Sequence, residues 1–136
     1  MKKYLAASLA VFVFYFFLWD KFLIGPVLGA AMASIPGAVA EPSMQWVVLG
    51  DLFAAMVLTG LYARTRSIFG ATPMGGATYG VYAGLLVNFP TWLSMSAYFS
   101  WPYRAAWHAT LVLIVVTVVA GAVMGAVYQA MDKNAA

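Results

Sequence analysis

The charged residues of this chain are few, and nearly all of them lie at or beyond the ends of four long apolar stretches. Only 8% of the 136 residues are charged and 65% are hydrophobic, whereas a soluble domain has roughly a quarter of charged residues. Each stretch has about the 20 residues that a helix needs to cross a bilayer. We therefore expect one all-α domain over residues 1–136, a transmembrane four-helix bundle. The expected spans are at about 4–20, 44–63, 75–98 and 104–129.

The apolar segment 22–43, between the first two expected spans, is interrupted by Gly25-Pro26, Pro36-Gly37 and Pro42. Proline has no N–H to donate and breaks a helix. Irregular backbone is not stable against lipid. We expect this Gly/Pro-broken segment to lie partly in the interface on the outer side of the membrane.

The first expected span contains a dense aromatic run, residues 12–19 (FVFYFFLW). This run suits a lipid-facing surface finished by an interfacial Trp19, or a docking face for a partner or an apolar ligand. The start at Lys2-Lys3 also fits a secretory signal. However, Asp20 and Lys21 separate the apolar core from small-residue cleavage sites further on, which favours a retained span.

Glycines recur every fourth residue in the third expected span, at Gly76, Gly80 and Gly84, and Asn88 continues the series. On a helix this spacing puts all four on one face. In lipid, a face of small residues lets another helix approach closely. Pro90 follows, so the carbonyl of Leu86 loses its helical partner and a kink is expected there.

Two other spans carry similar faces of small or weakly polar residues. The face of the fourth span ends at Gly121 and Gly125. We expect the three faces to pack against one another, while bulkier side chains contact lipid. The two faces are Val47, Asp51, Ala55, Thr59 and Ala63 in the second span, and Ala105, Ala109, Leu113, Thr117, Gly121 and Gly125 in the fourth.

Three polar residues lie within the outer part of the expected spans: Asp51, Asn88 and His108. An acid at the centre of a membrane helix costs about 2.5–3.5 kcal/mol to insert, so Asp51 is expected to face the interior, close to Asn88. The three residues could be structural, because hydrogen bonds between membrane helices are worth about 0.6–2 kcal/mol. They could instead form a proton-linked or ligand-binding site. His108 is also a weak candidate for ligating a porphyrin or chlorophyll metal.

The basic residues predict the orientation. With the N-terminus inside, Lys2, Lys3, Arg64, Arg66 and Lys133 would be cytoplasmic, and Lys21 and Arg104 outside. Because lysine and arginine favour the cytoplasmic side, we expect a multi-pass protein of the bacterial inner membrane with both termini in the cytoplasm. Glu41 and Trp101 are then expected outside.

The sequence offers little for catalysis. It has no cysteine and one histidine, which excludes thiolate and multi-histidine metal sites. We find no nucleophile–base pair, phosphate loop or nucleic-acid motif. We therefore expect neither an enzyme, nor a metal site, nor a resident cofactor, nor a nucleic-acid partner.

The chain resembles the small four-helix bacterial integral membrane proteins that are grouped as families of unknown function. The similar features are the aromatic first span running into Phe22-Leu23-Ile24-Gly25-Pro26, the Tyr62-Ala63-Arg64 exit, the Gly76–Gly80–Gly84 helix and the Gly121–Gly125 end. The resemblance implies fold and location, and brings no activity.

Two functions remain open from the sequence. The first is a non-catalytic bundle whose partners, besides the lipid bilayer, are other membrane subunits or further copies of itself, bound through small-residue helix faces. The chain would then be an accessory or interaction subunit of a larger assembly, or a homo-oligomer. The second is a small proton-coupled carrier or channel that uses Asp51 and Asn88. A pigment- or haem-binding subunit acting through His108 is a minor alternative.

Overall fold

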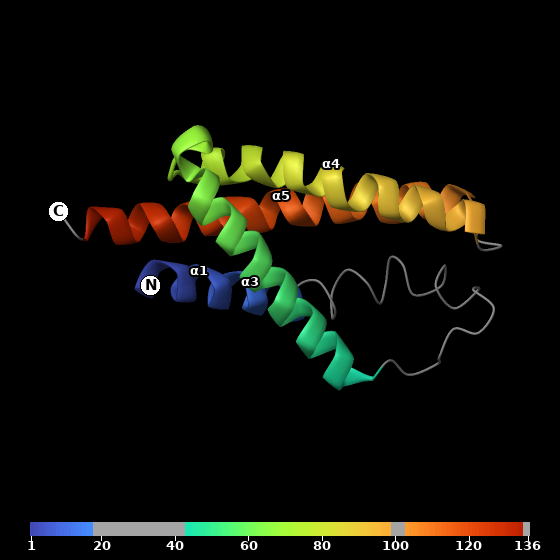
Figure 1. Ribbon diagram of the computed structural model, residues 1–136, viewed down its shortest axis with the longest axis horizontal. Helices are drawn as coiled ribbons and strands as arrows, with labels where there is room; N and C mark the ends of the chain where they lie inside the picture. The colour runs from blue at the N-terminus through green and yellow to red at the C-terminus, as the bar shows by residue number, and fades with distance from the viewer. Residues whose placement is uncertain (18–42, 99–102, 135–136) are drawn as a thin grey trace.

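The structure is a computed structural model that describes residues 1–17, 43–98 and 103–134. These residues form four helices and no strand, which confirms the all-helical prediction. The helices are α1 (Lys2–Val13), α3 (Met44–Phe69), α4 (Pro73–Tyr98) and α5 (Tyr103–Lys133), as labelled in Figure 1. The expected interfacial segment, together with Lys21, Glu41 and Trp101, lies outside the described residues apart from Ser43.

The turn between α3 and α4 is explained by the conformational preferences of a few neighbouring residues. Helix α3 continues past the expected end of its span at residue 63 to Phe69, and Gly70 then takes a φ of 87°, a conformation that glycine adopts most readily. Thr72 caps α4, because its hydroxyl accepts the N–H of Gly75 at 3.1 Å. Pro73 occupies the first helical position, where its missing N–H costs nothing. The turn therefore holds α3 and α4 together at one end.

Helices α4 and α5 lie side by side along their length and share the most extensive contact of the described structure (Figure 1). The glycines of the predicted stripes lie at this contact. A Cβ on Gly80 would sit 2.7 Å from the Cα of Val118, and one on Gly84 would sit 3.2 Å from the Cα of Ile114. Cβ atoms on Gly76 and Gly121 would each collide with the carbonyl oxygen of the other glycine. The two backbones therefore touch directly. Helix α4 itself continues through Pro90 to Tyr98.

Helices α1 and α3 pack against the α4–α5 pair, and their packing differs from the packing within that pair. Helix α3 crosses obliquely and touches α1 more than α4 (Figure 1). Its small face is buried at Ala55 and Thr59, and the Thr59 hydroxyl lies 3.4 Å from the sulfur of Met124 on α5. On this face, Thr59 therefore meets a methionine of α5.

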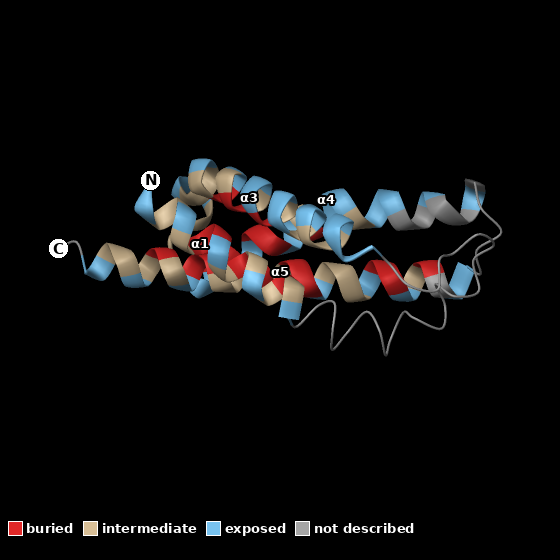
Figure 2. Ribbon diagram, turned by 90° about the horizontal axis from the view of Figure 1, so that it is seen from below, coloured by how far each residue is buried: buried red, intermediate tan, exposed pale blue. Residues whose placement is uncertain are grey.

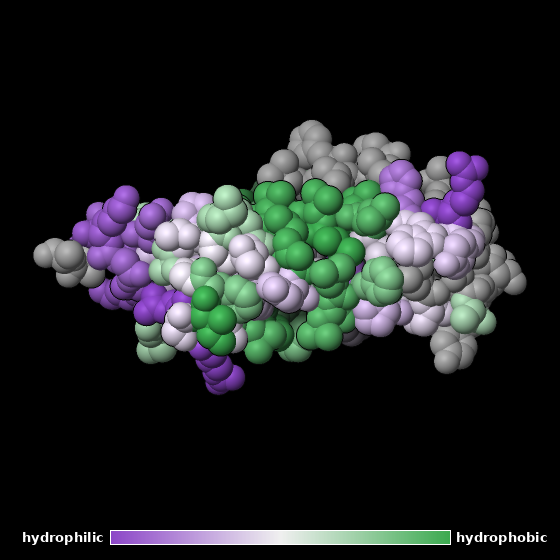
Figure 3. All heavy atoms as spheres, turned by 90° about the horizontal axis from the view of Figure 1, so that it is seen from above, coloured by the Kyte–Doolittle hydropathy of each residue, from purple (hydrophilic) through white to green (hydrophobic). Residues whose placement is uncertain are grey.

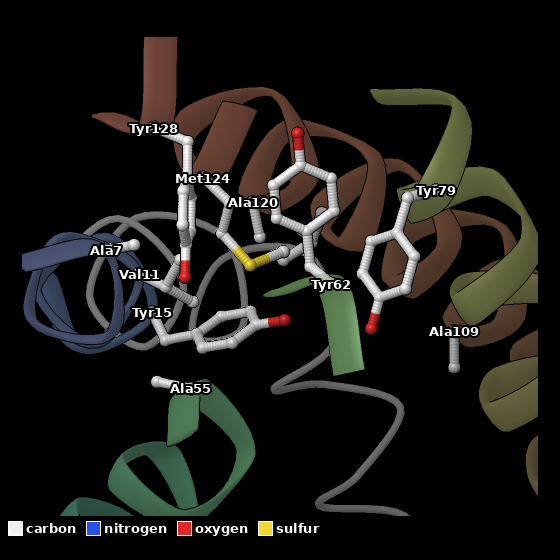
Figure 4. Close-up of a cluster of buried hydrophobic side chains, with 11 residues drawn as sticks. Ala7, Val11, Tyr15, Ala55, Tyr62, Tyr79, Ala109, Ala120, Met124 and Tyr128 are labelled. Atoms are coloured by element: carbon white, nitrogen blue, oxygen red, sulfur yellow. The ribbon is translucent and has the colours of Figure 1, made fainter. Parts of the chain in front are cut away.

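Tyrosines fill the space between α3 and the α4–α5 pair. The ring of Tyr62 lies 5.3 Å from that of Tyr79 and 5.6 Å from that of Tyr128, measured between centroids, and Figure 4 shows Met124 beside Tyr62 and Tyr128. The hydroxyl of Tyr62 donates to the carbonyl of Gly70 at 2.7 Å, and that of Tyr79 donates to the carbonyl of Leu58 at 2.9 Å. These rings supply apolar contact while their hydroxyls find acceptors.

The described surface carries the large apolar side chains, and the interior carries small and hydroxyl-bearing ones. Phe53 is 70% exposed and Leu86 77%, whereas Ala55, Thr59 and Ala120 are fully buried. Figure 2 shows exposed residues along the outer faces of α3 and α4 and buried ones turned inward. Figure 3 shows a hydrophobic belt across the middle of one face, with hydrophilic residues towards its ends. Among the described residues, the helices at 44–69 and 106–133 are long and apolar enough to cross a membrane.

Charged side chains join three helices at the end where α3 meets α4. Asp132 on α5 forms an ion pair with Lys3 on α1, and its Oδ2 lies 3.4 Å from Nη1 of Arg66 on α3. The guanidinium of Arg66 also lies 5.3 Å above the ring of Tyr128, a distance at which cation–π attraction operates. This network fixes the relative positions of the ends of α1, α3 and α5.

We predict that Gly80→Ala lowers the stability of the bundle in detergent by about 1–3 kcal/mol, because the added methyl group meets the backbone of α5. Thermal unfolding followed by circular dichroism measures the effect. Gly50→Ala is the matched control, since a Cβ there meets nothing within 4 Å. Equal melting temperatures for the two variants would show that α4 and α5 are not in backbone contact.

Candidate functional site

A cavity of about 360 Å³ lies between α3, α4 and α5, and is closed on one side by Tyr15, which follows α1. Most of its lining is apolar, but every part of the bundle contributes one polar side chain. The polar residues are Tyr15, Asp51 on α3, Asn88 on α4 and Thr117 on α5. The apolar ones are Phe53, Ala54, Val57, Leu58, Leu61, Ala83, Val87, Leu113 and Val116.

Thr117 is the centre of the polar contacts at this cavity. Its hydroxyl donates to the carbonyl of Leu113 at 2.8 Å and accepts from the side-chain amide of Asn88 at 3.2 Å. Tyr15 lines the same cavity from the other side. A threonine hydroxyl has one hydrogen and two lone pairs. Because the hydrogen is used on Leu113, the Thr117 hydroxyl acts as the acceptor for Asn88.

Asp51 borders the same cavity from α3. It lies one helical turn before Ala55 and two before Thr59, both fully buried, so the helical repeat turns its side chain towards the interior. The Oδ2 atom of Asp51 is buried, and Tyr15 lines the same cavity. The cavity thus has an acid beside a hydrogen-bonded group of neutral side chains.

The structure brings two of the three expected polar residues to one cavity. Asp51 and Asn88 both line it, and the amide of Asn88 is directed to Thr117. His108 is elsewhere: its side chain is exposed, while the neighbouring Ala109 and Thr110 are buried. Each residue of a helix turns by about 100°, which carries His108 off the buried face. A porphyrin ligated by His108 would lie outside the bundle.

Tyr15 is the residue of the site that the sequence interpretation missed. It belongs to the aromatic run expected to face lipid or a partner, yet it is only 8% exposed. Figure 4 shows its ring reaching from the end of α1 into the buried cluster. The available signal was the four-residue spacing of Ala7, Val11 and Tyr15, which puts all three on one buried face.

The side chains at this cavity can bind a small molecule, and the acid among them can hold a proton. The acid can accept hydrogen bonds, hold a proton or pair with a cation, and the neutral groups can orient a polar molecule. Among the described residues, no three histidine, cysteine, aspartate or glutamate side chains come together as metal ligands. The large apolar share of the lining suits a molecule with an apolar body.

No protein-family model, curated protein or solved structure matches this chain. The resemblance to small four-helix bacterial membrane proteins therefore remains an expectation from the sequence. What the protein does has to follow from its own residues and surfaces.

We predict that Thr117→Val lowers stability by about 1–2 kcal/mol, because it leaves the side-chain amide of Asn88 without the acceptor that joins α4 to α5. Chemical unfolding in detergent measures the change. Thr110→Val is the matched control, since the buried Thr110 hydroxyl donates only within its own helix, to Ala106 at 2.8 Å. A loss of stability no greater than that of the control would show that the Thr117 hydroxyl does not stabilise the contact between the helices.

Proposed function

We propose that this protein is a non-catalytic integral membrane helix bundle of the bacterial inner membrane. The observation that carries the proposal is the exposure of large apolar side chains around the described helices, such as Leu9 (62%), Phe53 (70%) and Leu86 (77%). In water each square ångström of such surface costs about 25 cal/mol, and soluble proteins rarely expose it in large continuous patches. Against lipid tails the same surface carries no such penalty.

The interior supports the same proposal. Membrane helices associate through small residues, close packing and hydrogen bonds rather than through the hydrophobic effect. Here the closest contact uses Gly76, Gly80 and Gly121, and a polar network joins Asn88 to Thr117. The apolar length of α3 and α5 is sufficient for a span.

The distribution of basic residues supports an orientation with both termini in the cytoplasm. One end of the bundle holds the ion pair of Lys3 with Asp132 and the neighbouring Arg66. Lys2, Arg64 and Lys133 lie near the same helix ends, whereas Arg104 lies at the start of α5, at the opposite end. An excess of lysine and arginine marks the cytoplasmic side.

Within the membrane, we propose that the bundle acts through interactions, as an accessory subunit of a larger assembly or as a homo-oligomer. Its outer faces are available for this role, because α3 makes little contact with α4 and leaves Phe53, Leu61 and Val87 exposed. Such faces can pack against another membrane helix.

A second candidate function is favoured by the cavity. A small carrier or channel needs polar groups that can bind a solute or a proton inside an apolar bundle. Asp51 and Asn88 line one cavity with Tyr15 and Thr117. A chain of this size would enclose a complete path by assembling with further copies.

We predict that the protein stays in the membrane fraction after an alkaline carbonate wash. After gentle detergent extraction, we expect native mass spectrometry to give an assembly heavier than the 14.6 kDa chain. Release by the wash would contradict membrane insertion. Retention followed by a single chain without partners would contradict the interaction role and leave the carrier as the better candidate.

A further inference from the structure

One side of α1 presents large apolar side chains to the outside of the bundle. Leu5, Leu9 and Val13 recur every fourth residue and are 58%, 62% and 45% exposed, and Phe17 continues the series beyond the helix at 52%. At 1.5 Å per residue these four residues extend over about 18 Å, a little more than half of a hydrocarbon core of roughly 30 Å. They form the α1 row, which matches the length of a lipid chain in one leaflet.

A lysine lies at the charged end of the α1 row. Lys2 is exposed and precedes Leu5 by three residues, so the helical repeat puts it on the same side of α1. The ion pairs that the described residues form at this end join Asp132 to Lys3 and to Arg66, and Lys2 belongs to neither. The α1 row thus ends at a positive charge outside the ion-pair network.

A second cation lies at the same end, on α3. The hydroxyl of Tyr4 on α1 donates to the carbonyl of Met56 on α3 at 3.1 Å, and a Cβ on Gly60 would lie 3.7 Å from the Tyr4 ring. Arg64 follows Gly60 by one helical turn, so it lies on the same side of α3 and nearer the helix end. It is exposed and also belongs to neither ion pair. Lys2 and Arg64 therefore put two cations at the charged end of the α1–α3 contact.

We propose that the α1 row binds an anionic phospholipid of the cytoplasmic leaflet. One acyl chain lies along Leu5, Leu9 and Val13, and the phosphate lies against Lys2 and Arg64. The inference rests on the proposed membrane placement and goes beyond it by naming a lipid partner and the residues that recognise its headgroup.

Charge complementarity selects this occupant. The described residues at this end include one acid, Asp132, and five basic side chains, which are those of Lys2, Lys3, Arg64, Arg66 and Lys133. A zwitterionic lipid would gain from the α1 row, but its own cationic group would be repelled there. A second copy bound symmetrically through the α1 row, in the same membrane orientation, would bring two Lys2 side chains together. An anionic lipid meets neither repulsion.

The test is native mass spectrometry of the full chain in a gentle detergent, titrated with phosphatidylglycerol or with phosphatidylcholine of the same acyl chains. We expect the first phosphatidylglycerol to bind at least tenfold more tightly than phosphatidylcholine, because each basic residue near an anionic group contributes about fivefold. Lys2→Gln should bind phosphatidylglycerol about fivefold more weakly, and Lys2→Arg should bind it as the natural chain does.

Lys133→Gln is the matched control, because it removes the same charge from an exposed position at the same end, on α5. Its affinity for phosphatidylglycerol should stay within twofold of the natural chain. Leu9→Ser keeps every charge but interrupts the α1 row, so it should weaken both lipids. Glycerol phosphate, a phosphate ester without acyl chains, should displace neither lipid at equal concentration.

The site is overturned if a folded Lys2→Gln binds phosphatidylglycerol as tightly as the natural chain, or if Lys133→Gln loses as much. Displacement by glycerol phosphate would replace the lipid by a free phosphate ester as the ligand. A lipid-free dimer that Leu9→Ser dissociates would assign the α1 row to a second copy. Either result would overturn the proposal.

Failure of the lipid site is distinguishable from failure of the proposed function. A chain that is released by the carbonate wash contradicts membrane placement. A chain that is retained by the membrane but binds the two lipids equally contradicts the lipid site alone.

Discussion

The direct contact between the backbones of α4 and α5 is the interaction on which the rest of the structure depends. At Gly76, Gly80 and Gly121, the space that a Cβ would occupy is filled by backbone atoms of the other helix. Such an approach is available only to glycine and brings many backbone atoms of the two helices into van der Waals contact. The pair therefore forms a rigid unit, and α1 and α3 pack against it through larger side chains.

Those larger side chains explain why the bundle has a polar interior and a cavity. Helix α3 is held off the pair by Tyr62, Tyr79 and Met124 rather than by glycines, so it diverges from α4. Among the polar groups that line the resulting space, Asn88 on α4 donates a hydrogen bond to Thr117 on α5. The same geometry that stabilises four helices also makes a site that can take a ligand.

Much of this arrangement could be predicted from the sequence, because some patterns have only one structural outcome. Glycines at four-residue spacing predict close packing whichever helix is opposite, and Asp51 and Asn88 were both expected inside. The spacing within one helix does not say which neighbouring side chains its face meets, and Met124, which Thr59 contacts, is not a residue of the predicted faces. The inward direction of Tyr15 was hidden by the aromatic residues around it, and the exposure of His108 depends on the rotation of α5.

The central claim is that the large apolar faces of the bundle contact lipid. It is tested most directly by the accessibility of a nitroxide label placed on a single cysteine in reconstituted protein, since the chain has no cysteine of its own. At Leu86, in the middle of α4, the label should collide readily with oxygen and rarely with a water-soluble nickel complex. At Arg64, near the charged end, the preference should reverse. Equal access of the nickel complex to both positions would contradict the account.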